Sequence, residues 1–234
     1  MIKRTEQARQ HLISTLASGL DVPLSIQNVE TADRRVRHSA VLILFGALDD
    51  VPASAPPSEV SSYLDVLLLR RSNGLRDHAG QIAFPGGGVE TGDSDRVATA
   101  LREAAEETGL IPSGVDVLGT LSEIHIPVSN HLVTPVIGWW RLPSKVAADH
   151  SESVEVFRVP VAELLDPANR GTSVLSRDGQ TFTGPAYRLG ERFGGRILWG
   201  FTSMLLTGLF DELGWSQPWD RQRTFGITPE NGGA

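Results

Sequence analysis

Apolar residues follow two spacings along this chain, one typical of helices and the other of strands. From Glu6 to Leu16 they recur every three or four positions, which predicts a short amphipathic helix that serves packing. Ala40 to Phe45 is an unbroken apolar run of strand length, as expected for a central strand covered on both faces. Asp65 to Arg70 predicts a second strand, and the proline- and serine-rich segment 49–62 predicts a loop between the two.

The second half of the chain predicts more strands and two helices. The strands are expected at 115–121, 124–126, 133–140, 184–189 and 196–198, and the helices at 161–165 and 199–213. Pro135 interrupts the third of these strands and indicates a sheet edge or a bulge, because proline lacks the N–H that a ladder needs. After Gly214 the chain is rich in Gly and Pro, and we expect the last dozen residues to be loose.

The stretch from Gly80 to Leu110 carries the densest chemical signal. Its segment 84–88, Phe-Pro-Gly-Gly-Gly, predicts a turn that brings bare backbone close to the residues that follow. A short helix comes next, with Ser94 as its expected N-cap and Gly109 as the residue that leaves it in a left-handed conformation.

This predicted helix gathers three glutamates. Helical geometry places Glu103 and Glu107 on one face with Glu106 beside them, and Arg102 one turn before Glu106, where it can pair with it. Like charges at this spacing cost a few tenths of a kcal/mol each, so a compensating cation is expected. Mg²⁺ suits carboxylate oxygens. A solvated acidic face is the alternative, which the adjoining glycine turn makes less favourable.

Composition narrows the class of protein. With 234 residues, 40% of them hydrophobic and 21% charged, the chain suits one globular domain with extensions. A net charge of -7 argues against wholesale binding to nucleic acid or to an anionic membrane. The absence of cysteine excludes disulfides, thiolate metal sites and cysteine nucleophiles. No targeting segment and no long apolar run is present, so we expect a cytoplasmic protein.

Positive charge is concentrated just before the glycine turn. Arg70, Arg71, Arg76 and His78 lie between the second predicted strand and the turn, where guanidinium groups can bind phosphate oxygens. We predict that these four side chains contact the substrate. Further along, the histidines at 125 and 131 are candidates for substrate contact, with a structural role as the alternative.

From Gly88 to Leu110 the chain resembles the Nudix box, Gly-x5-Glu-x7-Arg-Glu-apolar-x-Glu-Glu-x-Gly-apolar. The specified positions match, with Ala104 as a small apolar residue, except that Ser94 stands where the pattern has its first glutamate. Glu90 or Asp93 is then the candidate for the outer carboxylate. The resemblance implies an α/β fold, an α/β/α sandwich with a mixed β-sheet, over residues 31–214, with an N-terminal helical extension at 1–30 and a C-terminal tail at 215–234.

The segment before the box resembles a narrower signature, that of coenzyme A pyrophosphatases: Leu-Leu-Thr-x-Arg-Ser-x3-Arg-x3-Gly-x3-Phe-Pro-Gly-Gly. It is matched from Leu67 to Gly87, with Leu69 in place of the threonine. This resemblance implies hydrolysis of coenzyme A or acyl-CoA at its pyrophosphate, giving 3′,5′-ADP and 4′-phosphopantetheine. The two patterns together cover under a fifth of the chain.

The resemblance also implies roles for individual residues. Mg²⁺ or Mn²⁺ would bind Glu103 and Glu107, with Glu106 as a further ligand or a positioner of the attacking water; Glu103 as a base is an alternative. Gly86 and Gly87 would contact the substrate. Glu152 and Glu155 are candidates for a general base outside the box. Replacing Glu107, expected at the surface, by Gln should remove activity and leave the fold intact.

Two other functions stay open at this point. The same box could serve another nucleoside diphosphate derivative, such as NADH, ADP-ribose or a sugar nucleotide. Alternatively, the departure at Ser94 leaves room for a non-catalytic module that senses a nucleotide. The expected partner is a small molecule, and a homodimer is one possible assembly that the sequence leaves open.

Overall fold

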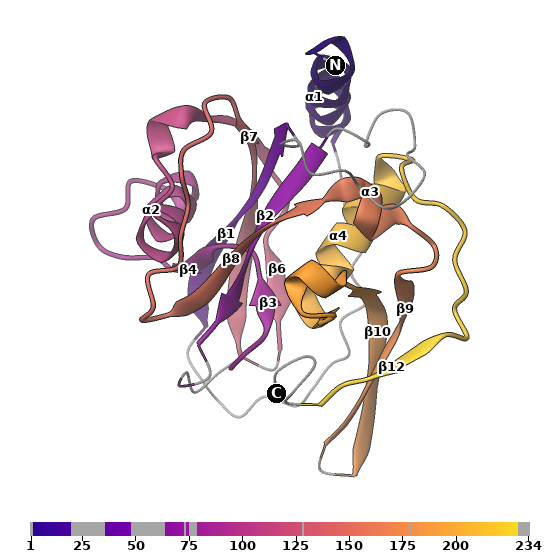
Figure 1. Ribbon diagram of the computed structural model, residues 1–234. Helices are drawn as coiled ribbons and strands as arrows, with labels where there is room; N and C mark the ends of the chain where they lie inside the picture. The colour runs from indigo at the N-terminus through magenta and orange to yellow at the C-terminus, as the bar shows by residue number, and fades with distance from the viewer. Residues whose placement is uncertain are drawn as a thin grey trace.

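The computed structural model describes residues 2–19, 36–47, 64–72, 74, 79–127, 129–177 and 179–228. Arg76, His78 and the predicted loop at 49–62 lie outside the described residues, so the expectations for them are not tested. The described part consists of two sheets with helices packed around them (Figure 1).

A mixed sheet of eight described strands forms the centre of the protein. The strands are β1 (Arg37–Ala47), β2 (Leu64–Arg71), β3 (Ile82–Ala83), β4 (Gly86–Gly88), β5 (Val115–Thr120), β6 (Ile124–Ile126), β7 (His131–Trp140) and β8 (Ser153–Pro160). Their order is β3-β2-β1-β7-β5, while β4 pairs with β1, β6 with β7 and β8 with β2. β1 runs antiparallel to β2 and parallel to β7, which confirms the prediction of a central strand.

Helices cover both faces of this sheet. They are α1 (Ile2–Ala17), α2 (Arg96–Thr108), α3 (Val161–Leu165) and α4 (Gly200–Glu212). Leu42, Leu44 and Leu67 of the sheet pack with Ala100 and Ala104 of α2 in one buried cluster. The other face packs with α1, α3 and α4 in a second cluster, so the sheet lies between helices (Figure 1). The predicted sandwich is confirmed. None of the described helices has the length and apolarity needed to cross a bilayer.

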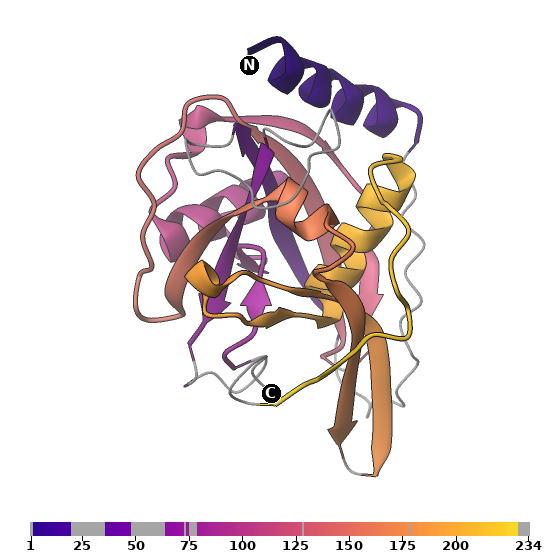
Figure 2. The same cartoon turned by 45° about the vertical axis from the view of Figure 1, so that its right-hand side comes forward.

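A second sheet follows the first in the chain. Its strands are β9 (Arg170–Arg177), β10 (Gln180–Arg188), β11 (Ile197–Leu198) and β12 (Thr224–Gly226), in the order β11-β10-β9-β12. Short 3₁₀ helices, η2 (Pro112–Gly114) and η3 (Glu191–Phe193), complete the described elements. The β9–β10 hairpin projects beyond the rest of the molecule (Figure 2). Since β12 pairs with β9, the expectation that the last dozen residues are loose was wrong for 224–226.

The strand that contains Pro135 is an interior strand, so the predicted edge position was wrong. β7 has β1 on one side and both β5 and β6 on the other. The carbonyl oxygen of Pro135 accepts a hydrogen bond from Leu121 N at 2.9 Å, between the ends of β5 and β6. Because the N–H and C=O of one strand residue point to the same neighbour, the missing N–H falls at that break. Proline is tolerated there.

Candidate active site

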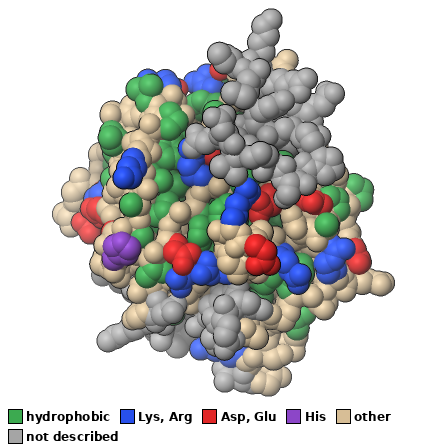
Figure 3. Space-filling model, viewed as in Figure 1, with side chains coloured by type: hydrophobic (Ala, Val, Ile, Leu, Met, Phe, Trp, Pro, Cys, Tyr) green, Lys and Arg blue, Asp and Glu red, His purple; other side chains and the backbone are tan. Residues whose placement is uncertain are grey.

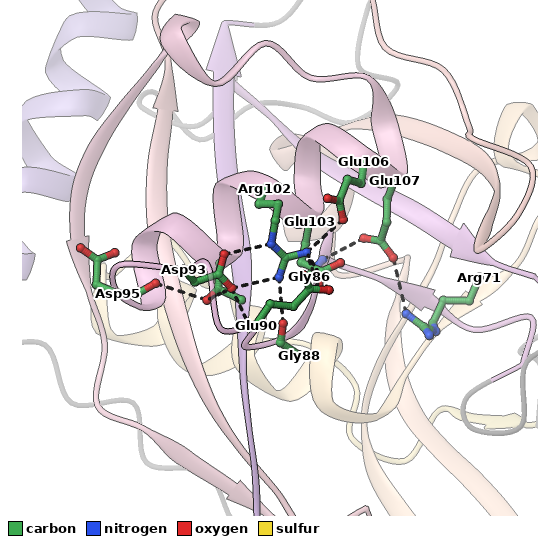
Figure 4. A network of polar contacts seen from close by, with 11 residues as sticks. Arg71, Gly86, Gly88, Glu90, Asp93, Asp95, Arg102, Glu103, Glu106 and Glu107 are labelled. Carbon is green, nitrogen blue, oxygen red and sulfur yellow. Dashed lines mark hydrogen bonds and ion pairs between the residues drawn. The ribbon is translucent and has the colours of Figure 1, made fainter.

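The glycine turn forms β4 and lies against both β1 and α2. A Cβ atom on Gly86 would lie 2.4 Å from Ala40 O, and a Cβ atom on Gly87 would lie 2.4 Å from Glu103 Oε1. Two glycines are therefore needed for different reasons. The first lets the turn pair closely with β1, and the second leaves room for the Glu103 carboxylate. Figure 4 shows Gly86 and Gly88 of this turn beside the glutamates of α2.

α2 begins one residue later than predicted. Asp95, not Ser94, is its N-cap, and the Asp95 side chain accepts a hydrogen bond from Ala98 N at 2.8 Å. Both residue types can cap a helix, and the reach of the carboxylate to the third following N–H decides between them. At the other end, Gly109 adopts φ 69° and donates to Ala105 O, which confirms the predicted left-handed termination.

Asp93, the residue directly before Ser94, binds Arg102. Arg102 donates from Nε to Asp93 Oδ1 at 2.9 Å and from Nη2 to Asp93 Oδ2 at 3.0 Å. Thr99 Oγ1 and Glu90 N also donate to Oδ2. These bonds, that of Arg102 above all, hold the pKa of Asp93 well below its usual range. Of the two candidates for the outer carboxylate, Asp93 thus binds Arg102 through two hydrogen bonds, whereas the exposed Glu90 lies 3.8 Å from Arg102 Nη1.

Arg102 also contacts the acidic face of α2. Its Nη1 lies 3.1 Å from Glu103 Oε1 and donates to Glu106 Oε2 at 3.0 Å, and its Nη2 donates to Gly88 O at 2.9 Å. The predicted pairing with Glu106 is confirmed. The Glu106 side chain is 59% exposed and that of Glu103 only 13%, so the two carboxylates lie in different surroundings. Burial raises the pKa of Glu103.

Glu107 is the most deeply buried of the three glutamates. It is 2% exposed, so the expectation of a surface carboxylate was wrong: β4 covers it. Gly86 N donates to Glu107 Oε2 at 2.9 Å, while Oε1 is buried without a hydrogen-bond partner and has Arg71 Nη1 at 3.7 Å. Burial raises the pKa of Glu107 to about 7, against the lowering effect of the Gly86 N–H.

The oxygen of Glu107 that lacks a hydrogen bond, Oε1, fits a divalent cation. A buried carboxylate oxygen without a donor is costly, and a cation would satisfy it. Glu103 lies close enough for its charge to raise the pKa of Glu107. Within the described ranges no three Asp, Glu or His side chains form a complete metal cage. Mg²⁺ does not need one, since it commonly binds one or two carboxylates, waters and substrate phosphates.

Arg70 and Arg71 point to opposite faces of the sheet. Arg71 lies on the side of α2, beside Glu107. Arg70 lies on the other side, where its Nη2 donates to Glu155 Oε1 at 2.9 Å. Arg196 also binds Glu155, from Nη1 at 2.8 Å and from Nη2 at 3.1 Å. Of the two predicted substrate contacts in β2, Arg71 therefore lies beside the acidic face, and Arg70 does not.

The two candidate bases differ in their surroundings. Glu155 is bound by the guanidinium groups of Arg70 and Arg196, which compensate its negative charge. Glu152 is exposed at the start of β8, and among the described residues nothing pairs with its carboxylate. Its backbone carbonyl accepts a hydrogen bond from Ser72 N at 2.8 Å, and the next residue, Ser153, donates to Glu107 O at 2.7 Å, so Glu152 lies beside the segments that carry Arg71 and Glu107. Arg196 was not predicted, because no sequence pattern connects it with a residue so far away in the chain.

The predicted histidine contacts have local partners. His125 Nε2 lies 2.8 Å from Asn130 Oδ1, and His131 Nδ1 lies 2.6 Å from Ser39 Oγ. His125 thus links β6 to the residue before β7, and His131 links β7 to β1, in both cases through side-chain contacts. On the face drawn in Figure 3, basic and acidic side chains alternate among the coloured residues, so no continuous basic surface is visible there.

Comparison with known proteins gives consistent matches. The NUDIX domain family matches residues 58–177. The uncharacterized Nudix hydrolase NudL of Photorhabdus laumondii is 33% identical over 177 residues, covering 76% of this chain and 85% of that protein. The protein of the same name from Escherichia coli K12 is 44% identical over 100 residues, which span 43% of this chain and 52% of its own length. A solved Nudix hydrolase from M. smegmatis aligns with a TM-score of 0.45 at 21% identity, over 60% of this chain and 81% of that one.

Proposed function

The chain belongs to the Nudix hydrolase family, and from this premise we propose that it hydrolyses coenzyme A or acyl-CoA at the pyrophosphate. The products would be 3′,5′-ADP and 4′-phosphopantetheine or its acyl derivative. One observation carries the proposal: Arg71, from the signature that resembles coenzyme A pyrophosphatases, lies 3.7 Å from the buried carboxylate of Glu107 in the box. The two motifs meet at one point, on the face of the sheet that α2 covers.

Each residue of the proposed site has a task that its surroundings support. Glu103 and Glu107 would hold Mg²⁺ or Mn²⁺, and Glu106 would be a further ligand or would position water. When bound, the ion would screen phosphate charge and lower the pKa of the attacking water. Arg102 keeps Glu103 and Glu106 in place through contacts that the Asp93 carboxylate anchors.

The substrate would lie between the glycine turn and the end of β2. There the guanidinium of Arg71 can bind a phosphate oxygen. Arg76, His78 and the backbone of Gly86 and Gly87 remain proposed substrate contacts, whereas Arg70 binds Glu155 on the other side of the sheet and is not part of this proposal. The water oxygen forms a bond to one phosphorus, the bridging P–O bond breaks, and the departing phosphate keeps the electron pair while the water proton passes to a base or to solvent.

A product assay tests this function directly. Purified protein is incubated with coenzyme A and either Mg²⁺ or Mn²⁺, and the nucleotides are separated by chromatography. We expect 3′,5′-ADP to appear in proportion to time and enzyme, and to be absent with EDTA. Glu107→Gln serves as the control for contaminating hydrolases. No 3′,5′-ADP at micromolar enzyme would refute the substrate proposal.

A substrate panel separates the alternatives within the family. Coenzyme A, acetyl-CoA, NADH, ADP-ribose and a sugar nucleotide are compared by kcat/KM under the same conditions. If kcat/KM for one of the last three compounds exceeded that for coenzyme A by tenfold or more, that compound would be the substrate instead.

The proposed cytoplasmic location and a homodimer are tested separately, by fractionation of cells and by light scattering of the purified protein.

A further inference from the structure

The five residues Asp149 to Ser153 form a tight turn that leads into β8, whose first residue is Ser153. The Asp149 carboxylate accepts hydrogen bonds from Ser153 N at 2.8 Å and from the hydroxyl of Ser151, and Ser153 Oγ lies 2.9 Å from Asp149 Oδ1. Glu152 N lies 3.3 Å from each of the two carboxylate oxygens of Asp149. The Asp149 side chain thus binds three residues of the turn, Ser151, Glu152 and Ser153, which fixes the backbone that carries the Glu152 side chain.

The turn is attached to the two elements that build the proposed active site. Ser153 is fully buried, and its hydroxyl donates to Glu107 O, in the last turn of α2, at 2.7 Å. Ser72 N, which follows Arg71 at the end of β2, donates to Glu152 O at 2.8 Å. Asp149 to Ser153 therefore cannot move independently of the segments that carry Glu107 and Arg71.

The backbone of the turn adopts a costly conformation. His150 has φ 67°, a left-handed value that non-glycine residues rarely adopt, and its N–H donates to Ser153 O at 2.9 Å. Strained residues of this kind persist where the surrounding structure over-determines them, and they concentrate at functional sites.

We propose that this turn is a positioning element, with Asp149 as its key residue, that holds the carboxylate of Glu152 toward Glu103 and Glu107, where it orients the attacking water. The inference rests on the proposed function and extends it to a residue outside the box. A second observation points to a ligand at this place: the buried Oε1 of Glu107, which no donor satisfies. Glu155, the other candidate, is held by Arg70 and Arg196 on the opposite side of the sheet.

A double-mutant cycle tests whether Asp149 acts through Glu152. We expect Glu152→Gln to lower kcat by about 100-fold or more and Asp149→Ala by about 10- to 100-fold, with KM for coenzyme A changed less than about threefold. In the double variant, Asp149→Ala should add less than about twofold to the loss from Glu152→Gln. Independent losses that multiply would overturn the proposal.

A matched control removes another aspartate whose carboxylate accepts a backbone hydrogen bond in a turn, at a distance from the site. Asp166 accepts from Ala168 N at 2.8 Å before β9. Asp166→Ala should leave kcat within about twofold of wild type. If Asp149→Ala fails to fold, Asp149→Asn, which keeps one acceptor oxygen, replaces it in the cycle. A variant at Asp149 with a lower Tm and a wild-type kcat would show that the turn is purely structural.

Binding of Mn²⁺, followed by electron paramagnetic resonance without substrate, gives a readout that does not depend on turnover. Since Glu152 is assigned to water and not to metal, Asp149→Ala and Glu152→Gln should keep the Kd within about threefold, whereas Glu107→Gln should weaken it by about 10-fold or more. Equal weakening by all three would contradict this role. Wild-type turnover with a fully active Glu152→Gln refutes this inference alone; an inactive wild type refutes the proposed function.

Discussion

Arg102 and Asp93 form a two-point ion pair at the centre of the acidic face, with Nε 2.9 Å from Oδ1 and Nη2 3.0 Å from Oδ2. The same guanidinium donates to Gly88 O and lies within 3.1 Å of Glu103 Oε1. The Asp93 carboxylate, which lies outside α2, thereby holds Arg102 in the position from which it contacts Glu103 and Glu106. The glycine turn and α2 are joined through this pair as well as through apolar packing.

Loss of the Asp93 carboxylate should therefore affect activity through Arg102. We expect Asp93→Ala to lower kcat/KM by about 10- to 100-fold, because positioning partners of this kind commonly contribute that much. Its Tm should also fall. Ser94→Ala is the neighbouring control, since Ser94 makes no cap bond, and both values should stay close to wild type. Kinetics and thermal unfolding of the two variants, side by side, check this; a fully active Asp93→Ala would contradict it.

The metal-free protein should lose stability as pH rises because of Glu107. Burial raises the pKa of this carboxyl from 4.5 to about 7 in the folded state. A carboxyl with a raised folded pKa favours folding below its unfolded pKa, and the contribution is lost as pH rises through the folded value. From this group we expect a fall in unfolding free energy of about 2–3 kcal/mol between pH 5 and pH 8.

Urea unfolding in EDTA across that pH range measures the effect. Glu107→Gln removes the titrating group, so its unfolding free energy should vary less with pH, and at pH 8 it should exceed that of the metal-free wild type. The same variant should be inactive. Identical pH profiles for the two proteins would show that Glu107 does not have a raised pKa in the absence of metal.

The three consecutive glycines of β4 should respond differently to alanine. Gly86→Ala places Cβ 2.4 Å from the backbone of Ala40 and should destabilise the fold by about 3 kcal/mol or more. Gly87→Ala places Cβ against the carboxylate of Glu103, a side-chain end that can shift more easily than backbone, so Tm should change less while Mn²⁺ affinity and kcat fall by about 10-fold or more. Gly88 has open space, and Gly88→Ala serves as the control for Tm and metal affinity. An equal loss of Tm at all three positions would contradict this reading.

The two neighbouring arginines of β2 should make unequal contributions. Arg71→Ala removes the cation beside Glu107 and a proposed phosphate ligand, so KM for coenzyme A should rise by about 10-fold or more. Arg70→Ala leaves Glu155 with Arg196, on the other side of the sheet, and its KM should rise less. Steady-state kinetics of both variants decide the order; a larger effect at Arg70 would place the substrate on the opposite face.

The sequence predicted the elements that have a strong apolar pattern, and it predicted less where contacts between distant segments decide. β1, α2 and α4 were predicted because apolar residues recur at helix or strand spacing within each. β9 was not predicted: Arg170 to Arg177 contains few large apolar residues, and pairing with β10 and β12 holds it. β12 became a strand for the same reason, through its ladder with β9.

At the candidate site, the helical spacing predicted which glutamates share a face but not which of them is covered. Glu103, Glu106 and Glu107 differ in exposure because β4 approaches α2 at one place, and only the tertiary structure determines where. The choice of Asp95 over Ser94 as N-cap likewise depends on where the first helical N–H groups point. Sequence spacing contains neither piece of information.

The parallel pairing of β1 with β7 has a consequence for how the chain folds during synthesis. Arg37 lies opposite His131, so the partner strand emerges from the ribosome roughly ninety residues after the first. Until then one edge of β1, a largely apolar strand, has backbone N–H and C=O groups without their partners from β7, and it is open to chaperones. We expect nascent chains that end before His131 to be protease-sensitive, and those that include Trp140 to acquire their first resistant core.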